Sequence, residues 1–416
     1  MSNKAEYVAA IDLGHAHTRA AIAEAPAGGT DDGTRLRLLG VGEAPSNGWI
    51  KGNLVDMEAA VASVRDAVAK AEQMADGLVI ESAVIGTGGS HLHSIGSHDG
   101  MLLSHSQPRE VANNDVLQLM DEVRSVPLAA DREIIHVLPR EFVLDSRGGI
   151  RDPVGLLGIQ LAVHGYVLTG SAAVGRNLVA AVNRASVMVE TVAAESYAVG
   201  EAAPSVDERT SGVMAVVIGG ASSEMIVYRH GGVVMSASIA VGGDHFTNDL
   251  MIGLHTARAD AESIKQTFGA VTAGWRHTGT TFEVPELGRP TSRLIQQSLL
   301  REILEARGME LFSLVLSELR HASLPEKLEE HLEAGIVLCG GGANLPGMCD
   351  LAERVLLMPA RIGLPPRVLG LPESLDAPQY TVLLSLLHYA LRVRRHRAPQ
   401  GSRSASPWKH LFDWKK

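Results

Sequence analysis

Glycine-rich turns between apolar segments are the features of this sequence best suited to binding a ligand. The first turn holds Gly14 and His15, the second holds Gly219, Gly220 and Ala221, and a later run holds Gly340, Gly341 and Gly342 with Asn344 close behind. In such turns successive backbone N–H groups converge on an anion, and a side chain at the crossing would block its approach. A single turn of this kind is more often an ordinary hairpin. Three of them together predict a phosphate-binding site.

The elements around the first two turns follow the same pattern twice. The first set is expected as strands at Tyr7–Asp12, Thr18–Ala23 and Leu36–Val41, then a helix at Met57–Met74. The second set is expected as strands at Val213–Ile218, Glu224–Tyr228 and Val233–Ile239, then a helix from about Asp244. Two similar α/β halves with facing glycine turns resemble the actin/Hsp70/sugar-kinase superfamily, in which a nucleotide lies between the halves. P-loop and Rossmann fingerprints are absent from the sequence.

Resemblance to this superfamily implies ATP as the cofactor, with magnesium held by an Asp at each phosphate turn. Asp12 matches the first of these positions and is the candidate metal ligand. At the second turn Val217 stands where the Asp is usual, Ala221 replaces a Gly, and Glu224 stands at a later Asp position. Loss of the second carboxylate removes the group best placed to hold the metal and its attacking water. Weak or absent ATP hydrolysis is therefore expected.

Motifs between and after the halves narrow the resemblance to one family. They are His136-Val137-Leu138-Pro139-Arg140-Glu141-Phe142, Gly149 to Gly158, Ser46 to Gly52, Gly288-Arg289-Pro290, Gly335 to Gly347 and Leu386 to Tyr389. In this order they resemble the bacterial cell-division protein FtsA, whose small inserted subdomain replaces the usual actin insertion. The resemblance covers roughly residues 7 to 392 and also the C-terminal tail. It implies an actin-like two-domain α/β ATPase fold with an FtsA-type inserted subdomain.

The family resemblance also implies a division of the chain into subdomains. Residues 5–81 with 167–190 and 359–394 would form subdomain 1A, 82–166 the inserted subdomain 1C, 191–232 with 335–358 subdomain 2A, and 233–334 subdomain 2B. Residues 395–406, rich in Arg, Ser and Pro, would be a flexible linker before a helix at 407–416. A long helix is expected from Thr291 to His321.

The C-terminal tail differs in charge and composition from the rest of the chain. From Arg392 to Lys416 there are eight Lys/Arg and one Asp, which gives +7 and leaves −17 for the remainder of a chain with net charge −10. On a helical wheel Trp408, Leu411, Phe412 and Trp414 fall in one arc, and Lys409, Asp413 and Lys416 lie opposite. The candidate membrane-contacting residues are Trp408, Lys409, Leu411, Phe412, Trp414 and Lys415. A basic, Trp-rich terminus of this kind predicts an interfacial helix on an anionic membrane, although a tail docked on its own domain is the alternative.

Bulk composition limits the other function classes. The acidic body argues against nucleic-acid binding, and no apolar run reaches the roughly 20 residues that span a bilayer. Two cysteines, Cys339 and Cys349, predict reduced thiols in a cytosol, and no export signal is expected. The histidines around His91-Leu92-His93 match no zinc pattern. Glu190, Glu195 and Glu201 lie where related ATPases place a catalytic acid, but none is assigned as a base.

The family resemblance implies a peripheral adaptor at the cytoplasmic face of the inner membrane at the division site. It would self-assemble into filaments, anchor FtsZ polymers through the FtsZ C-terminal peptide, and help to recruit later division proteins. Arg293 and Arg307 match basic residues of the family's docking surface, and Arg307 suits an acidic peptide. Two alternatives remain at this point: a pilus- or competence-type actin-like adaptor, and a metabolite kinase of the same superfamily.

Overall fold

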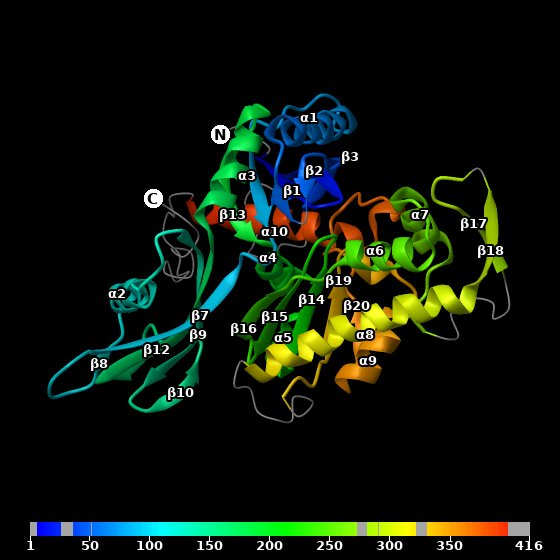
Figure 1. The fold of residues 1–416 in the computed structure, drawn as a ribbon. Helices are drawn as coiled ribbons and strands as arrows, with labels where there is room; N and C mark the ends of the chain where they lie inside the picture. Colours follow the sequence, from blue (N-terminus) through cyan, green and yellow to red (C-terminus); the bar gives the residue numbers. More distant parts are fainter. Residues whose placement is uncertain are drawn as a thin grey trace.

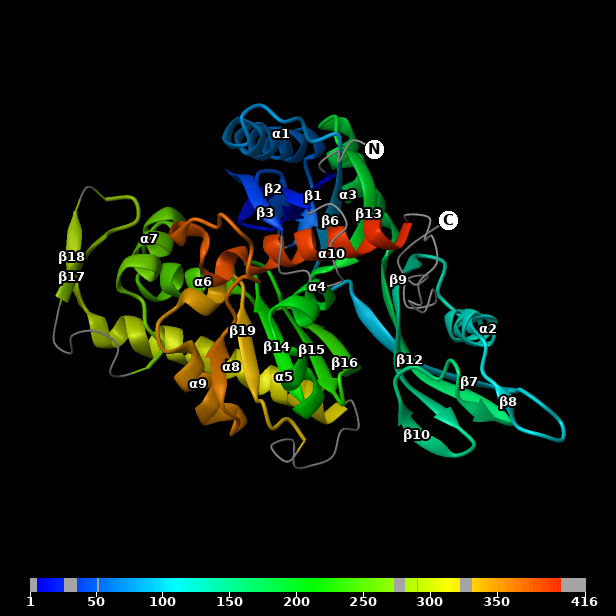
Figure 2. The ribbon, with the colours of Figure 1, turned by 180° about the vertical axis from the view of Figure 1, so that it is seen from behind.

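The computed structural model describes residues 6–25, 36–50, 52–272, 281–289, 291–321 and 331–397. Two domains, each built on a five-stranded sheet, lie one above the other in Figure 1, and an inserted subdomain projects from the first. Seen from behind in Figure 2, helix α10 (Thr381–Arg397) runs between the two sheets. The predicted tail residues 398–416, including all the candidate membrane-contacting side chains, lie outside the described part of the chain.

The first sheet has the order β13-β6-β1-β2-β3. Its strands are β1 (Glu6–Leu13), β2 (His17–Ala25), β3 (Arg37–Pro45), β6 (Ser82–Thr87) and β13 (Met188–Ala194). Strands β1, β2 and β3 form an antiparallel meander, whereas β6 and β13 run parallel to β1. A two-stranded hairpin, β4 (Trp49–Ile50) with β5 (Asn53–Leu54), follows β3.

Helix α1 (Met57–Met74) covers one face of the first sheet at the position that the sequence predicts. The Asp56 side chain accepts a hydrogen bond from the Ala59 N–H at 3.1 Å and so caps the first turn. Apolar residues at helical spacing, among them Val61, Val64 and Val68, are buried against the sheet together with α3 (Ala172–Arg184). The helix therefore forms where capping and apolar periodicity agree.

The second sheet has the order β16-β15-β14-β19-β20. Its strands are β14 (Val213–Ile218), β15 (Ser223–Arg229), β16 (Gly232–Ile239), β19 (Ile336–Cys339) and β20 (Ala360–Ile362). The pattern of antiparallel and parallel neighbours repeats that of the first sheet, because β14, β15 and β16 form a meander and β19 and β20 run parallel to β14. The two similar halves predicted from the sequence are confirmed.

Helices cover both faces of the second sheet. On its outer face lie α6 (Gly243–Gly253), α7 (Arg258–Phe268), α8 (Gln297–His321) and α9 (Met348–Leu356), and on its inner face lie α4 (Glu195–Ala202) and α10. Helix α5 (Val206–Ser211) leads into β14. One hydrophobic core joins the inner faces of both sheets through α4 and α10. The two domains are thus packed on each other through these two helices.

The inserted subdomain is a four-stranded sheet of order β10-β9-β12-β7. Its strands are β7 (His93–Leu102), β9 (Arg132–Leu144), β10 (Arg147–Ile150) and β12 (Gln160–Ser171), and β8 (Arg109–Glu110) pairs separately with β11 (Leu157–Gly158). Helix α2 (Asn113–Arg124) packs on this sheet and shares its core. At the opposite end of the molecule a hairpin, β17 (Thr281–Pro285) with β18 (Ser292–Gln296), projects beyond α7 and α8 (Figure 1).

Several boundaries expected from the sequence were wrong. The inserted subdomain does not begin at residue 82, because β6 (Ser82–Thr87) pairs with β1 inside the first sheet. Strand β16 belongs to the second sheet and not to subdomain 2B, and β20 pairs with β19 and not with subdomain 1A. Strand pairing between residues far apart in sequence sets these limits, and local patterns do not reveal it.

Two helix limits were also wrong. The long helix begins at Gln297 and not at Thr291, since residues 292–296 pair with β17 as strand β18. Helix α10 continues to Arg397, so residues 395–397 belong to this helix and not to the expected linker. In the described ranges no helix combines the length and apolarity needed to cross a bilayer.

Candidate functional site: the facing glycine turns

The structure brings the first two glycine turns into contact. The first turn joins β1 to β2, and the second joins β14 to β15, so each follows the first strand of its sheet. A Cβ added to Gly220 would lie 3.4 Å from the Cβ of His15 and 3.6 Å from the backbone N of Ala16. The neighbouring Ala221 lies close to the β4–β5 hairpin. A Cβ added to Gly52, in the turn of that hairpin, would be 3.6 Å from the Cβ of Ala221. The two turns therefore form one local surface between the domains.

The third glycine run lies beside the second turn. Strand β19 ends at Cys339, and residues Gly341–Asn344 form a short 3-10 helix after it. Gly340 has φ +83°, and an added Cβ would lie 2.6 Å from the carbonyl oxygen of Ile218. Only glycine fits this close approach to the end of β14. The Asn344 Nδ2 donates to Gln379 Oε1 at 2.7 Å, which fixes the amide side chain at the edge of the loop.

Space remains above the middle of this third run. A Cβ added to Gly341 would have the Gln379 Cβ, at 4.0 Å, as its nearest contact. All three glycine segments lie at the carboxyl ends of β1, β14 and β19, the edge where open α/β sheets bind ligands. The predicted cofactor-binding residues of the second and third segments thus share one region of the fold.

His15 links the first turn to the second domain. Its Nε2 lies 2.9 Å from Asp244 Oδ2, in the first turn of α6, and Arg258 Nη2 lies 2.9 Å from Asp244 Oδ1. The imidazole therefore lies where the two turns meet, and its hydrogen bond joins the two domains. The pKa of Asp244 is lowered, because hydrogen bonding and charge from His15 and the charge of Arg258 outweigh the effect of its burial.

The first N–H groups of α6 are satisfied by the second turn. Gly243 N–H donates to Gly219 O at 2.8 Å, and Asp244 N–H donates to Gly220 O at 2.8 Å. A helix N-terminus otherwise leaves such donors unpaired. The carbonyl groups of the second turn are therefore turned towards α6, and this holds the turn in one conformation.

Three carboxyl groups converge beside the turns. They belong to Asp12 at the end of β1, Glu195 at the start of α4, and Glu224 on β15. A Cβ added to Gly88 would lie 2.2 Å from Glu224 Oε1 and 2.8 Å from Glu195 Oε2. Gly89 N–H donates to Glu224 Oε1 at 2.7 Å. We refer to Asp12, Glu195 and Glu224 as the acidic trio.

The environment of the acidic trio favours protonated forms. Burial raises the pKa of Asp12 to about 6, and the Arg19 guanidinium, 3.8 Å from Oδ2, opposes this rise. Burial likewise raises the pKa of Glu224 to about 7, against the opposing hydrogen bonds from Gly89 and Ser196. Desolvation raises the pKa of Glu195 well above its ordinary range, and the other two carboxyls raise it further. The trio therefore holds protons near neutral pH.

Glu195 was left without a role by the sequence, although it follows a buried strand at the first turn of a helix. The other two glutamates that the sequence singled out, Glu190 and Glu201, lie away from the acidic trio and have other partners. Glu190 accepts from Arg394, and Glu201 accepts from Tyr228 and Arg392. Only Glu195 of the three reaches Asp12 and Glu224. Glu195 directly follows a parallel strand and begins a helix. This position in the sequence could have distinguished Glu195 from Glu190 and Glu201.

Magnesium fits this region in chemistry but not in arrangement. Carboxylate oxygens are suitable ligands for a hard cation, and Asp12 is one of three carboxyls here. Within the described ranges, however, no three or more His, Cys, Asp or Glu side chains are arranged to hold a metal ion. Val217 is 5% exposed and pairs directly with Glu224 across β14 and β15. In the second sheet the carboxyl group at this level therefore lies on β15 and not on β14.

The two predicted partner-binding arginines lie in different elements. Arg307 is on α8, where its Nε and Nη2 donate to the two oxygens of Asp249 at 2.6 and 2.8 Å, and it also contacts Glu310. Arg293 is not on the helix as expected but on β18, where Nη2 donates to Leu254 O at 2.5 Å. Both arginines already have partners in the second domain.

Comparison with known proteins decides the family. A model described as cell division protein FtsA matches residues 214–385, and a model described as the SHS2 domain inserted in FtsA matches residues 89–169. Cell division protein FtsA of Pseudomonas aeruginosa is 33% identical over 385 residues, covering 92% of this chain and 89% of that protein. The chain belongs to the FtsA family of cell-division proteins. The FtsA proteins of Escherichia coli K12 and Bacillus subtilis 168 are 33% and 32% identical, covering 90% and 86% of those proteins and 92% and 95% of this chain.

Solved structures confirm the fold of this FtsA-family chain. The PilM–PilN type IV pilus biogenesis complex matches with a TM-score of 0.64 at 15% identity, covering 92% of this chain and 98% of that one. MreB5 of Spiroplasma citri bound to AMPPNP matches with a TM-score of 0.57 at 14% identity, covering 94% and 97%. The predicted actin-like fold and the FtsA-type insertion are thus confirmed, and the chain has a role in cell division.

Proposed function

We propose that this FtsA-family chain anchors FtsZ polymers to the cytoplasmic face of the inner membrane at the division site. The observation that carries the proposal is the relationship to FtsA proteins over 92% of the chain. In this role the chain self-assembles into filaments and helps to recruit later division proteins. The inserted subdomain, which FtsA-family models describe separately, would provide self-contact and partner binding.

The composition of the C-terminal tail supports membrane attachment. Two of the four tryptophans of the chain and three lysines lie in residues 407–416. Each Lys or Arg near an anionic leaflet contributes about 1 kcal/mol, and burial of large apolar side chains adds to this. Ordering a helix of about ten residues offsets part of the gain. One tail would therefore bind weakly, and a filament with many tails would bind tightly through effective concentration.

Arg307 is the proposed contact for the acidic C-terminal peptide of FtsZ. Its guanidinium is 21% exposed and already pairs with Asp249 and Glu310. An incoming carboxylate would therefore compete with these two acids for the exposed N–H donors of the guanidinium. Arg293 on β18 would contribute through the surface between the hairpin and α8, and not as part of the helix.

ATP is the proposed cofactor, bound by the three glycine segments. MreB5 of Spiroplasma citri, which has the same fold, was crystallised with AMPPNP and with ADP. Asp12, Gly14 and the second turn would face the phosphates, and the Gly340–Asn344 loop would face the adenosine. Glu224 would supply the carboxyl that Val217 lacks. Hydrolysis is expected to be weak or absent, because the acidic trio tends to hold protons.

Liposome co-sedimentation tests the proposal directly. The full chain and a truncation ending at Ala405 are mixed with anionic vesicles and FtsZ polymers, with and without ATP. We expect the full chain to pellet with vesicles and to carry FtsZ with it, and the truncation to remain in the supernatant. Equal pelleting of the two forms would refute membrane attachment through the tail.

Arg307→Glu provides the matched test of FtsZ docking. We expect this variant to pellet with vesicles like the wild type but to leave FtsZ behind. Arg289→Glu is the control, because that arginine is on the exposed turn of the β17–β18 hairpin with a side chain 74% exposed. Unchanged recruitment of FtsZ by Arg307→Glu would refute the assigned docking residue while leaving membrane attachment in place.

A further inference from the structure

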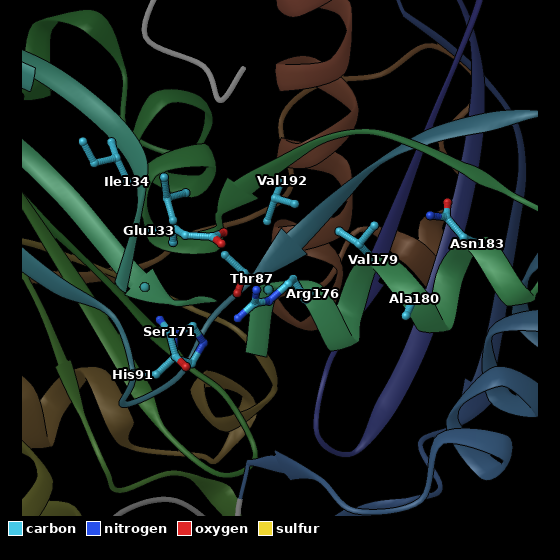
Figure 3. Close-up of a pocket in the computed structure, with 13 residues that line it drawn as sticks. Thr87, His91, Glu133, Ile134, Ser171, Arg176, Val179, Ala180, Asn183 and Val192 are labelled. Carbon is cyan, nitrogen blue, oxygen red and sulfur yellow. The ribbon is translucent and has the colours of Figure 1, made fainter. Parts of the chain in front are cut away.

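A cavity of about 390 Å³ lies away from the glycine turns, between the first domain and the inserted subdomain. Its walls come from helix α3, from the ends of β6 and β13, and from β9 and β12 (Figure 3). None of the predicted nucleotide-binding residues lines it. Small-molecule sites typically have volumes of about 300–1,000 Å³ and combine apolar walls with a few polar groups. This cavity has that size and that composition.

One polar group in the cavity wall is buried without a partner. Thr87, at the end of β6, is 2% exposed, and its Oγ1 makes no hydrogen bond within the described part of the chain. A buried hydroxyl without a partner destabilises the fold by about 1–3 kcal/mol. A ligand atom in the cavity would remove this cost. Thr87 is therefore an independent indication of a missing hydrogen-bond partner.

His91 adds a neutral donor on the same wall. The Ser171 N–H donates to His91 Nδ1 at 3.3 Å, so the proton of the neutral ring is on Nε2. Burial lowers the pKa of His91, which keeps the ring neutral at pH 7. His91 and Thr87 together give the cavity two uncharged groups that can donate to an acceptor.

One cation and one anion complete the lining. Arg176 on α3 and Glu133 on β9 direct their charged ends into the same cavity, as Figure 3 shows. Arg176 Nε donates to Ala172 O at 3.2 Å, which leaves the terminal nitrogens of the guanidinium directed to the cavity. Apolar contact is provided by Val179 and Val192. The cavity therefore presents a positive group, a negative group and an apolar wall together.

We propose that this cavity binds a zwitterionic apolar α-amino acid. Arg176, Thr87 and His91 receive its carboxylate, Glu133 receives its ammonium group, and the side chain packs on Val179 and Val192. A fatty acid would pair its carboxylate with Arg176 and give Glu133 no opposite charge, and an apolar amine would pair with Glu133 and give Arg176 none. In both cases one charged side chain of the lining gains no ionic partner from the ligand. Because the walls belong to two units, the bound ligand also holds the inserted subdomain against the first domain.

Calorimetric titration of the full chain with L-phenylalanine tests the ligand class. The comparators are 3-phenylpropanoate, which lacks the ammonium group, and phenethylamine, which lacks the carboxylate. We expect saturable binding of L-phenylalanine and at least tenfold weaker binding of either comparator. Equal affinity for all three would overturn the zwitterion assignment, and no heat with L-phenylalanine up to 10 mM would overturn the site.

Matched variants locate the binding. Arg176→Gln is expected to weaken L-phenylalanine binding at least tenfold. Arg184→Gln, on the same helix but outside the cavity lining and with a side chain 57% exposed, is expected to bind like the wild type. Thr87→Val keeps the shape of the side chain and removes its hydroxyl, so it should also bind L-phenylalanine more weakly. This variant replaces Arg176→Gln in the test if circular dichroism shows that Arg176→Gln does not fold. Wild-type affinity in Thr87→Val and in a folded Arg176→Gln would overturn the proposed site.

Discussion

The two domains share one strand order but place their acidic residue on different strands. In the first domain, Asp12 on β1 pairs in register with Arg19 on β2. In the second, Val217 on β14 pairs with Glu224 on β15. Directly paired residues of an antiparallel ladder point to the same face. A carboxyl therefore reaches the region between the domains from both halves.

The difference lies in how each carboxyl is compensated. Asp12 has a guanidinium 3.8 Å away, and Arg19 itself also pairs with Glu43 at 2.6 Å. Glu224 has instead the backbone N–H of Gly89 and an apolar neighbour on the paired strand. Two sheets with the same arrangement of strands therefore differ in how their buried carboxyl groups are compensated. Four changes test this, from the largest expected effect to the smallest.

Placing an acid on the first strand of the second domain should have the largest effect. Val217→Asp would set a carboxylate directly opposite Glu224 in a site that is 5% exposed. A new carboxyl that is buried here without a partner destabilises the fold by about 3–5 kcal/mol. Thermal melting should show a midpoint lowered by about 5 °C. Val206→Asp, at a position 69% exposed, is the control and should melt like the wild type.

Removing the compensating cation of the first domain should have a smaller effect. Arg19→Met leaves Asp12 and Glu43 without their guanidinium, but both acids can take up protons, so we expect a loss of about 2 kcal/mol. Urea denaturation at pH 7 measures it, and Arg37→Met on β3, 67% exposed, is the control. If the two variants lose equal stability, Arg19 does not compensate the buried acid.

Glu224→Gln should change the pH dependence of stability. The folded state raises the pKa of Glu224 from 4.5 to about 7, so it favours the protonated acid. Stability from this group is present in full below about pH 4.5 and is lost as the pH rises through about 7. The wild type should therefore lose stability between about pH 4.5 and 7, and Glu224→Gln should lose less. Denaturation midpoints at four pH values measure this.

The exposed Glu58 provides the control for that experiment. Its side chain is 81% exposed and its pair with Arg184 is at the surface. Glu58→Gln should follow the wild-type pH profile. A Glu224→Gln profile as steep as that of the wild type would show that Glu224 is not the group that titrates, and would leave Asp12 or Glu195 in its place.

Opening the contact between the two turns should have the smallest effect. His15→Ser removes the imidazole that lies against Gly220 and bonds to Asp244. We expect ATP affinity to fall by about two- to fivefold, which corresponds to less than 1 kcal/mol, because His15 is one of the predicted cofactor-binding residues of the first turn. Titration with a fluorescent ATP analogue measures this, and His17→Ser, on the following strand, is the control. An equal or higher affinity in His15→Ser would show that His15 does not contact the nucleotide.

Much of the local structure followed from the sequence. Strand β14 and helix α1 have the predicted limits because apolar periodicity, the Asp56 cap and glycine turns act within a few residues of the chain. The repeated halves were visible for the same reason. Local patterns gave the wrong element for Arg293, which was expected on a helix. It lies on strand β18, and that strand depends on pairing with residues 281–285 across a turn.

The sequence by itself determined the two glycine-turn halves, their order and the family. Only the tertiary structure decided which acids meet Asp12, that His15 bonds to Asp244, and that a cavity lies between α3 and the inserted subdomain. Glu195 and Glu224 reach Asp12 from positions about 180 and 210 residues away in the chain. Local patterns encode elements because their contacts are short in sequence, whereas the site depends on packing between elements that lie far apart along the chain.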